Sequence, residues 1–449
     1  MFKKLIVTCA VLFALVSLTS IAVSQVVNKA APAVKDEETK NDLYSKVELF
    51  SYALTTIQSE YVEEKTPKDL IYGSLKGMLS SLDPHSQFMD QNDYKELKTE
   101  TRGKFGGLGI EITVKDSLLT IITPIEDTPA WRAGLKAGDR IVKIEKDLTR
   151  DITLDDAVKK LRGEPGTQVH VTILRESEGL IKEFTITREI IHVIDVKDVH
   201  VIDDHIGYIR LTEFREDSYK EFKAGLDKLK AAGADSLIID LRNNPGGLLT
   251  VAIKISEEFL PAGKTIVTTK GRHATQDVAA ISNNKSGDYL KWPMAVLINE
   301  GSASASEIFA GAMKDNKRGI TVGSKSFGKG SVQSVIPMPD GTGLRLTTAK
   351  YFTPSGVCIH GIGITPDVVI ERVYPKDDKD DTKKDKDKKD VEKIFEDVKE
   401  KEAKEPVTEE EKKEAALKKK DAEDNQLQSA LNVIKAIKVY RQFPDAVAK

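Results

Sequence analysis

The chain has 449 residues, a length that accommodates two or three domains. Its 68 basic and 71 acidic side chains give a formal net charge of −3, which is too close to zero to indicate nucleic acid or an anionic membrane surface as a partner. The seven histidines match no metal-binding spacing, so we expect no metal site and no other cofactor.

The amino terminus has the pattern of a secretory signal peptide. The basic start Met1-Phe-Lys-Lys4 precedes an apolar run from Leu5 to Val23, and Ala22-Val-Ser24 fits a cleavage site. We therefore assign residues 1–24 to a signal peptide and expect export to the periplasm or cell envelope. The run also approaches membrane-spanning length, so its retention as an inner-membrane anchor is the alternative.

Residues 41–100 form a helical region with two amphipathic segments. Apolar side chains recur there at steps of three and four, the period of a helix with one buried face. They are Val47, Phe50, Leu54, Ile57 and Tyr61, then Ile71, Leu75, Leu79 and Leu82. We expect these helices to pack on the rest of the chain or to pair between subunits, so a homodimer stays open.

Residues 101–190 have the pattern of a small β-rich domain. A glycine-rich segment, Phe105 to Ile112, precedes Pro129-Ala-Trp-Arg-Ala-Gly-Leu-Lys-Ala-Gly-Asp139 and a helical stretch from Leu154 to Leu161. This order resembles a PDZ domain, in the circularly permuted form that bacterial proteases carry. The resemblance implies that a peptide end adds to a sheet edge while N–H groups of a loop bind its carboxylate. That loop comprises Gly106, Gly107, Leu108, Gly109 and Ile110, although a glycine-rich strand start also fits a simple β-bulge.

Two predicted strands lead into turns of small residues. The first is followed by Pro245-Gly246-Gly247, where glycines allow close backbone approach. The second, Met294 to Ile298, leads into Gly301-Ser-Ala-Ser-Ala-Ser-Glu307, which opens a helix. A hydroxyl at a helix N-terminus lies beside free N–H groups that stabilise negative charge. The structural alternative is a capping box, which Ser304 and Glu307 also fit.

The segment Phe327-Gly-Lys-Gly-Ser-Val-Gln333 supplies a lysine with no acid within four positions on either side. A serine hydroxyl becomes a good nucleophile only when a base takes its proton. Lysine, with an ordinary pKa of about 10.4, acts as that base near neutral pH when burial away from acids lowers its pKa. Ser304 and Lys329 are therefore a candidate nucleophile–base pair, and a regular strand would place Gln333 on the same face as Lys329.

The same region matches most of a nucleotide-binding P-loop. Gly323 to Lys329 fits its first seven positions, but the eighth, which should be Ser or Thr, is Gly330. The alternation from Gly330 to Ile336 predicts a strand where a P-loop needs a helix. We therefore expect no nucleotide binding.

Together the motifs closely resemble the C-terminal processing peptidases, also called tail-specific proteases. The likeness covers residues 45–370 in the family's order. Its motifs are Leu82-Asp-Pro-His-Ser86, Asp240-Leu-Arg-Asn-Asn-Pro-Gly-Gly247, Gly301-Ser-Ala-Ser-Ala-Ser-Glu-Ile308, Ala310-Gly-Ala-Met-Lys-Asp315, Phe327–Gln333, Thr347–Gly356 and Gly361–Asp367. The resemblance implies a crotonase-like protease core of ββα units over residues 195–372. We thus expect an α/β (α+β) protein with an inserted PDZ domain and helices at both ends.

The resemblance also implies the roles of individual residues. Ser304 corresponds to the nucleophile, Lys329 to its base, and Gln333 to the residue that orients the lysine. Asp315 matches an aspartate with a catalytic part in some members, although an acid late in a helix also fits a structural role.

An acyl-transfer reaction needs donors for its oxyanion. The N–H of Ala305, next to the nucleophile, is one candidate. The resemblance implies that Gly246 or Gly247 supplies the other, without choosing between them.

The carboxyl-terminal part has a different composition. Residues 375–420 are rich in Lys, Asp and Glu in near balance, which predicts a flexible or solvated helical linker. Residues 421–449 carry an apolar stripe of helical period at Leu427, Leu431, Ile434 and Ile437. One hypothesis is that this helix docks on the amino-terminal helices and completes a dimer.

The sequence therefore predicts an exported, ATP-independent serine endopeptidase that cleaves proteins near their carboxyl termini. We expect the PDZ domain to bind the tail of a protein or peptide substrate and to gate access to Ser304. Membrane association through the amino terminus would accompany a retained anchor. The alternative is an inert PDZ-bearing adaptor or chaperone in the periplasm, against which the intact Ser304, Lys329 and Gln333 argue.

Overall fold

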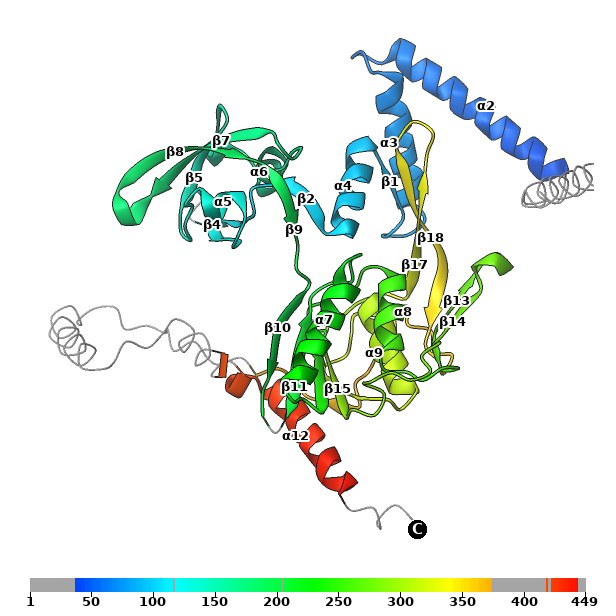
Figure 1. The fold of residues 1–449 in the computed structure, drawn as a ribbon. Coiled ribbons are helices and arrows are strands. Elements are labelled where there is room, and N and C mark those ends of the chain that lie inside the picture. The colour runs from blue at the N-terminus through cyan, green and yellow to red at the C-terminus, as the bar shows by residue number, and fades with distance from the viewer. Residues whose placement is uncertain (1–36, 116–117, 204, 374–416, 419–420, 443–449) are drawn as a thin grey trace, which may run out of the picture. The chain divides into compact units, whose positions relative to one another are not determined.

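The computed structural model describes residues 37–115, 118–203, 205–373, 417–418 and 421–442 (Figure 1). The predicted signal segment and nearly all of the predicted charged linker lie outside these described residues. The chain divides into two compact units, residues 1–81 and 82–449. No helix within the described ranges is both long and apolar enough to cross a membrane.

The first unit contains two helices, α2 (Glu37–Glu60) and α3 (Pro67–Ser80). α3 begins where the side chain of Thr66 accepts a hydrogen bond from the N–H of Asp69, with proline at the first helical position. The predicted apolar stripe lies on α2, and most of its large side chains, such as Val47 and Phe50, are exposed. This unit therefore presents an apolar helix surface.

The second unit begins with a β-rich domain built around a sheet in the order β3-β4-β5-β7-β8, with β6 paired to β5. Its strands are β3 (Ile110–Lys115), β4 (Leu118–Pro124), β5 (Arg140–Ile144), β6 (Asp147–Leu148), β7 (Gln168–Arg175) and β8 (Leu180–Thr187). The helices α5 (Pro129–Arg132) and α6 (Leu154–Leu161) complete it, and Ala130, Ala157 and Leu161 are buried with the apolar side chains of the sheet. A two-stranded ribbon of β2 (Lys104–Gly107) and β9 (Glu189–His192) joins the domain to the rest of the unit.

A buried ion pair explains the Ala-Gly-Leu-Lys-Ala-Gly-Asp signature of this domain. The guanidinium of Arg175 donates from Nε and Nη2 to the two carboxylate oxygens of Asp139, each at 2.7 Å. Asp139 also accepts from the N–H of Lys136, and Arg175 donates to the carbonyl of Gly134. Gly134 adopts a positive φ of 80°, which glycine tolerates at little cost. The signature is thus a turn fastened to the end of β7 by a bidentate pair.

A six-stranded sheet, in the order β10-β11-β12-β15-β16-β19, forms the largest core. Its strands are β10 (Val196–Val201), β11 (Ile206–Leu211), β12 (Ser236–Asp240), β15 (Met294–Ile298), β16 (Ile320–Gly323) and β19 (Val368–Val369). β10 is antiparallel to β11, and the remaining neighbours are parallel. Parallel strands are usually covered on both faces, which accounts for the continuous apolar runs that the sequence shows here.

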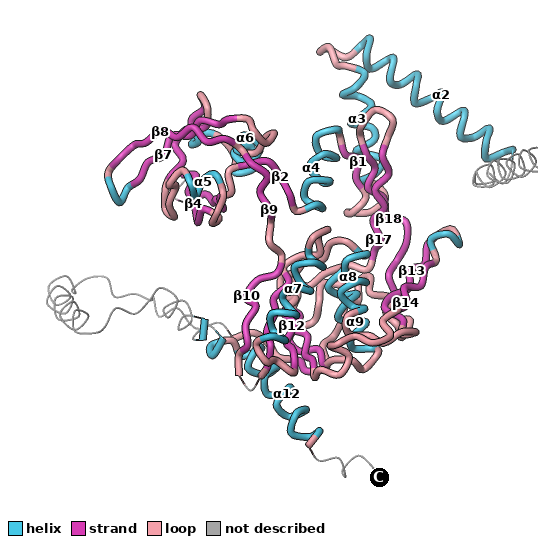
Figure 2. Tube along the Cα trace, viewed as in Figure 1, coloured by secondary structure: helices cyan, strands magenta, loops and turns pink. Residues whose placement is uncertain are grey.

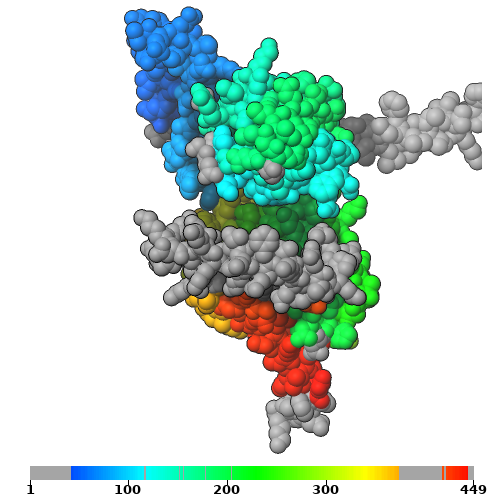
Figure 3. Space-filling view, turned by 90° about the vertical axis from the view of Figure 1, so that its left-hand side faces the viewer, coloured from blue at the N-terminus to red at the C-terminus, as the bar shows by residue number. Residues whose placement is uncertain are grey.

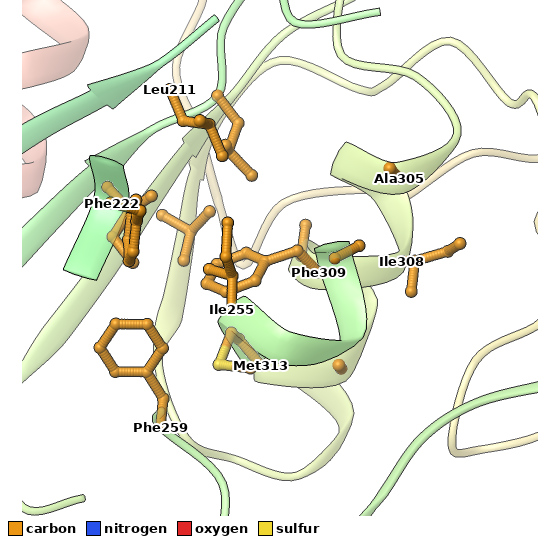
Figure 4. Packing of buried hydrophobic residues seen from close by; sticks show 14 of the residues in the cluster. Leu211, Phe222, Ile255, Phe259, Ala305, Ile308, Phe309 and Met313 are labelled. Atoms are coloured by element: carbon orange, nitrogen blue, oxygen red, sulfur yellow. The ribbon is translucent and has the colours of Figure 1, made fainter. Parts of the chain in front are cut away.

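Successive residues of the central strands belong to opposite faces. Leu237, Ile239, Val296 and Ile298 pack with α7 (Ser218–Ala231), α8 (Leu249–Glu257) and α9 (Ala305–Asp315) in one cluster. Figure 4 shows Phe222, Ile255, Phe309 and Met313 of these helices meeting beside Phe259. The intervening residues, Ile238, Ala295 and Leu297, face a second cluster.

The second cluster is closed by α12 (Asn425–Arg441) from the carboxyl-terminal segment. Leu427, Ala430, Leu431 and Ile434 are buried against the sheet, and Figure 3 shows α12 (red) beside green and yellow-to-orange parts of the chain. The hypothesis that this stripe docks on the amino-terminal helices is therefore wrong, because its own core sheet already covers it.

A charged contact fixes the start of α12. Both carboxylate oxygens of Asp424 lie 2.8–2.9 Å from the guanidinium of Arg242, which also binds Asp240 at the end of β12. Arg242 and Asp240 are buried, so the pair is shielded from water.

A second sheet has the order β1-β18-β13-β14, with β17 added along β18. Its strands are β1 (Gln87–Met89), β13 (Thr265–Gly271), β14 (Val278–Ile281), β17 (Ser331–Pro337) and β18 (Gly343–Phe352). Figure 2 shows β17 and β18 as a long hairpin. The turn Leu82–Ser86 leads into β1, and α4 (Gln91–Arg102) follows it.

Candidate active site

Ser304 occupies a strained turn between β15 and α9. Its φ of 53° and ψ of −111° lie outside the regions that residues with a Cβ favour, and such strain is typical of functional sites. The turn lies directly against Gly246, where an added Cβ would come within 2.6 Å of the Ala303 carbonyl and 2.8 Å of the Ser304 Cβ. The two glycine- and serine-rich turns that the sequence singled out therefore meet.

The flanking serines of the SASAS run hold this turn in place. Ser302 Oγ donates to the carbonyl of Leu241 at 2.8 Å, and Ser306 Oγ donates to that of Asn244 at 2.9 Å. Both serines are fully buried, whereas Ser304 between them is partly exposed. Of the three hydroxyls, only that of Ser304 has access to solvent and thus to a substrate.

The carboxylate of Glu307 connects Ser304 to the lysine loop. Its Oε2 accepts from the backbone N–H groups of Ser304 and Lys329, each at 2.8 Å. Its Oε1 accepts from the N–H of Gly328 and the hydroxyl of Ser326, each at 2.6 Å. Burial raises the pKa of this carboxyl, while the four hydrogen bonds favour the ionised form and act in the opposite direction. Glu307 therefore belongs to the capping interaction that the sequence suggested, but it also anchors the backbone of the candidate base.

The same contacts disfavour the P-loop interpretation. The N–H groups of Gly328 and Lys329, which would surround a phosphate in a P-loop, bind an internal carboxylate instead. The next element is the strand β17, as the alternation predicted, and not a helix.

Lys329 lies in the loop before β17 with its side chain half-buried. Burial lowers the pKa of its amine, the positive charge of Arg345 lowers it further, and the carboxylate of Glu307 acts in the opposite direction. The Ser304 hydroxyl and the Lys329 amine, both described, share no hydrogen bond here; such contacts often form only when substrate binds. The structure thus brings their backbones together and gives the lysine the environment of a base.

Gln333 lies on β17, two residues after Ser331. Its Nε2 donates to Ser331 Oγ at 3.1 Å and to Thr347 Oγ1 at 2.9 Å. Its carbonyl oxygen is buried and has no hydrogen-bond partner among the described residues. The face shared with Lys329 cannot be argued from a regular strand, because β17 starts only at Ser331 and its register with β18 shifts between Val332 and Gln333.

The two candidate glycines differ in their free hydrogen-bonding groups. The N–H of Gly246 donates to Asn244 Oδ1 at 2.9 Å, so it is occupied. The N–H of Gly247 meets no acceptor in the described part of the chain, and this residue is exposed. The N–H of Ala305, at the first position of α9, has no partner within the helix. Gly246 thus leaves space beside Ser304, whereas the N–H groups of Gly247 and Ala305 are the unengaged ones of the three candidates among the described residues.

Asp315 is not part of this group. It is the last residue of α9, and a rise of about 1.5 Å per residue places it about 16 Å along the helix from Ser304. Its carboxylate accepts from the N–H of Ser355 at 2.9 Å. This contact fits the structural role that the sequence left open.

Three family models match the chain: peptidase family S41 over residues 205–370, a PDZ domain over 120–175, and the activating protease CtpB N-terminal domain over 5–93. A carboxy-terminal-processing protease of Bartonella bacilliformis is 42% identical over 75% of this chain and 77% of its own length. The chain belongs to the carboxy-terminal processing proteases of family S41.

The chain is also similar to other proteases named for carboxyl-terminal processing. A carboxyl-terminal-processing protease of Synechocystis is 40% identical over 67% of this chain and 71% of its own length. Among solved structures, the photosystem II D1 C-terminal processing protease is 29% identical, covers 71% of this chain and 86% of its own, and has a TM-score of 0.44. The expected α/β protein with a PDZ domain is confirmed, and the protein is a serine-type peptidase.

The predicted peptide-binding residues of the PDZ domain separate into two groups. Gly106 and Gly107 lie in β2 and pair with β9, and a Cβ on Gly106 would approach the Gly163 carbonyl to 2.0 Å. Leu108 and Gly109 follow as a loop whose carbonyls accept from Ala130 and Ile125. Their N–H groups have no acceptor among the residues described, and Ile110 then opens β3, the last strand of its sheet.

The sequence did not reveal the part that Glu307 plays in the lysine loop of this peptidase. The only signal was the Ser-x-x-Glu spacing, which indicates contact with Ser304 but not with Lys329. The sequence also did not reveal the hydrogen bond between Gln333 and Thr347, because pairing of β17 with β18 brings these two residues together.

Proposed function

We propose that this peptidase cleaves protein substrates near their carboxyl ends with Ser304 as nucleophile, Lys329 as general base and Gln333 as the residue that orients Lys329. The observation that carries the proposal is that one oxygen of Glu307 accepts hydrogen bonds from the backbone N–H groups of both Ser304 and Lys329. The lowered pKa of Lys329 supports the role of a base.

The neutral Lys329 amine takes the proton of the Ser304 hydroxyl as the oxygen attacks the scissile carbonyl carbon. The N–H groups of Ala305 and Gly247 donate to the oxyanion that forms, and each such donor is worth about 10²–10³ in kcat. The Lys329 ammonium then protonates the leaving amine, and the C–N bond breaks to leave an ester on Ser304. Water, deprotonated by Lys329, attacks this ester and releases the new carboxyl end.

The PDZ domain is the proposed receptor for the substrate tail. Its support is the pair of unengaged N–H groups at Leu108 and Gly109 beside the outer strand β3, which suits capture of a terminal carboxylate and addition of a strand. The chain enters and leaves the domain through adjacent strands, with Val193 N–H bonded to the Gly103 carbonyl at 2.9 Å. Such a double connection permits the domain to move as one body, and we propose that this movement gates access to Ser304.

Cleavage of a peptide with an apolar carboxyl end, without ATP or metal, tests the activity. We expect wild-type protein to cut it and Ser304→Ala to bind it without cutting. Amidation of the peptide's terminal carboxylate should weaken binding and slow cleavage. Equal cleavage of the acid and amide forms of the peptide would contradict the role given to the PDZ loop. If the wild-type protein bound the peptide but did not cleave it, the inert adaptor would be the better interpretation.

Export and self-association complete the proposal. The pattern of residues 1–24 supports a signal peptide or a retained anchor, which Edman sequencing of the protein from the cell envelope distinguishes. The exposed Val47, Phe50 and Ile57 of α2 support a homodimer. Sedimentation of a Phe50→Asp variant as a monomer, beside a dimeric wild type, would support pairing through α2.

A further inference from the structure

The turn Leu82–Ser86, for which the sequence suggested no chemical role, belongs to a hydrogen-bond chain that ends at Gln333. Asp83 Oδ1 accepts from the N–H groups of His85 and Ser86, and Ser86 Oγ donates to Asp83 Oδ2 at 2.8 Å. The turn is therefore closed by its own aspartate, as in an Asx-turn.

The Ser86 hydroxyl links this turn to β18. It accepts from the backbone N–H of Thr347 at 3.1 Å, and Ser86 itself is buried. Pairing of β1 with β18, from Gln87 with Arg345 to Met89 with Gly343, continues the contact along the strand. The position of Thr347 on β18 is thus fixed from the side of the Leu82–Ser86 turn.

Thr347 in turn fixes the orientation of the Gln333 side chain. A glutamine amide has two N–H donors and one carbonyl acceptor. Both donors are used, one on Ser331 Oγ and one on Thr347 Oγ1. In this orientation the amide donates to both hydroxyls, and its carbonyl oxygen is left as a buried acceptor without a partner among the described residues.

We propose that the Asp83–Ser86 turn is a positioning element of the active site, acting through Thr347 to keep the Gln333 carbonyl available as the acceptor for the Lys329 amine. This inference rests on the proposed Ser304–Lys329 mechanism. Asp83, Ser86 and Thr347 touch neither substrate nor the reacting atoms. Their effect reaches Lys329 through Gln333 alone.

The charge that Lys329 gains during the reaction determines which orientation of the Gln333 amide is favourable. During acylation Lys329 becomes an ammonium ion, which needs an acceptor, and a carbonyl oxygen supplies it. A rotated amide would present an N–H₂ group, which repels the ammonium ion. Loss of the Thr347 hydroxyl should therefore make proton transfer from Ser304 less favourable and lower the pKa of Lys329 further.

The test compares three variants of the full chain. Thr347→Val removes the hydroxyl with little change in shape, Thr347→Ser restores it, and Thr348→Val removes the hydroxyl of the next residue, which pairs with Ser334 Oγ at 2.7 Å. We expect Thr347→Val to lower kcat about tenfold, the effect of one well-placed hydrogen bond. The acid limb of its kcat/KM profile should move to lower pH, while Thr347→Ser and Thr348→Val stay near wild type.

Three charged or titratable groups near Lys329 bear on that profile. The charge of Arg345 lowers the pKa of Lys329 and the carboxylate of Glu307 raises it, while burial and the charge of Lys329 lower the pKa of His85. These groups are the same in every variant, so a difference from the wild-type limb follows the substitution itself.

Two outcomes would overturn the inference. One is a Thr347→Val enzyme with wild-type kcat and pH profile. The other is an equal loss in Thr347→Val and Thr348→Val with an unshifted limb, which would show that the hydroxyl matters only for folding. Undiminished cleavage by Ser304→Ala would instead refute the proposed mechanism, and this inference with it.

Discussion

The backbone N–H groups of Ser304 and Lys329 donate to the same oxygen of Glu307, each at 2.8 Å. These residues are 25 positions apart, and they come from a helix start and a loop that precedes a strand. A single buried carboxylate therefore sets the spacing of the proposed nucleophile and base.

Replacing either member of the pair should abolish cleavage. Ser304→Ala removes the nucleophile, and Lys329→Met keeps the length of the side chain but not the amine. We expect at least a 10³-fold loss of kcat/KM for each, with native circular dichroism. Lys325→Met, an exposed lysine of the same loop, serves as the control and should keep its activity. Full activity of Lys329→Met would remove the lysine from the mechanism.

Arg345→Gln should shift the pH dependence of activity. The proposed base Lys329 acts only in its neutral form, so we expect kcat/KM to rise as pH rises through its pKa. Arg345 lowers that pKa by repulsion, and its removal should raise the pKa and move the rising limb to higher pH. A pH–rate profile measures the shift. Lys350→Gln removes a charge from the exposed end of the same strand and should leave the limb in place.

Glu307→Gln should destabilise the protein as well as inactivate it. An amide places an N–H₂ group where a carboxylate oxygen now accepts two hydrogen bonds, so donors become unsatisfied in a buried site. At about 1–3 kcal/mol for each of the two unsatisfied donors, we expect a loss of about 2–6 kcal/mol in the free energy of unfolding. Urea denaturation checks this value, with exposed Glu300→Gln as the control. A stable, active Glu307→Gln protein would contradict the role of the carboxylate.

Gly246→Ala should inactivate the enzyme through the position of Ser304. An added methyl group would lie 2.8 Å from the Ser304 Cβ and 2.9 Å from the Ala305 nitrogen, at a φ of 104°. A displacement of about 1 Å in such a site costs about 100-fold in rate. Gly263 has a comparable positive φ of 86° but open space around it. Gly263→Ala therefore measures the effect of backbone strain without a steric contact. Similar kinetic losses in both variants would show that contact with Ser304 is unimportant.

Shortening a buried side chain of α12 should destabilise the core. Leu431→Ala leaves a cavity against the sheet, and such changes cost about 2–5 kcal/mol. Val439→Ala, on the exposed side of the same helix, should change stability by less than about 0.5 kcal/mol. Chemical denaturation of the two proteins distinguishes a docked helix from an independent one.

Local sequence patterns predicted the strand–turn–helix around Ser304 because its determinants are adjacent in the chain. The apolar run Met294–Ile298, the small turn residues and the period of α9 all lie within about two dozen positions. The strand after Lys329 was predicted for the same reason. Both elements were found in the structure.

The remaining features depend on contacts between distant segments. The choice between Gly246 and Gly247 required knowledge that the Asn244 side chain occupies one N–H group. The relation of Gln333 to Lys329 could not be read from strand alternation, since the strand begins after Lys329 and its register shifts. The surface on which α12 packs was predicted wrongly, because an apolar stripe indicates that a helix is buried but does not identify the surface that buries it.

The ion pair between Asp424 and Arg242 has a consequence for the order of events during biosynthesis. Arg242 stands two residues before Asn244, whose carbonyl and amide hold the turns at Ser304 and Gly246. Asp424, at the start of α12, thus adds a second carboxylate to a guanidinium that Asp240 already pairs. Until α12 has been synthesised and has docked, Arg242 is paired by Asp240 alone, so we expect the loop beside Ser304 to be held less firmly before that step.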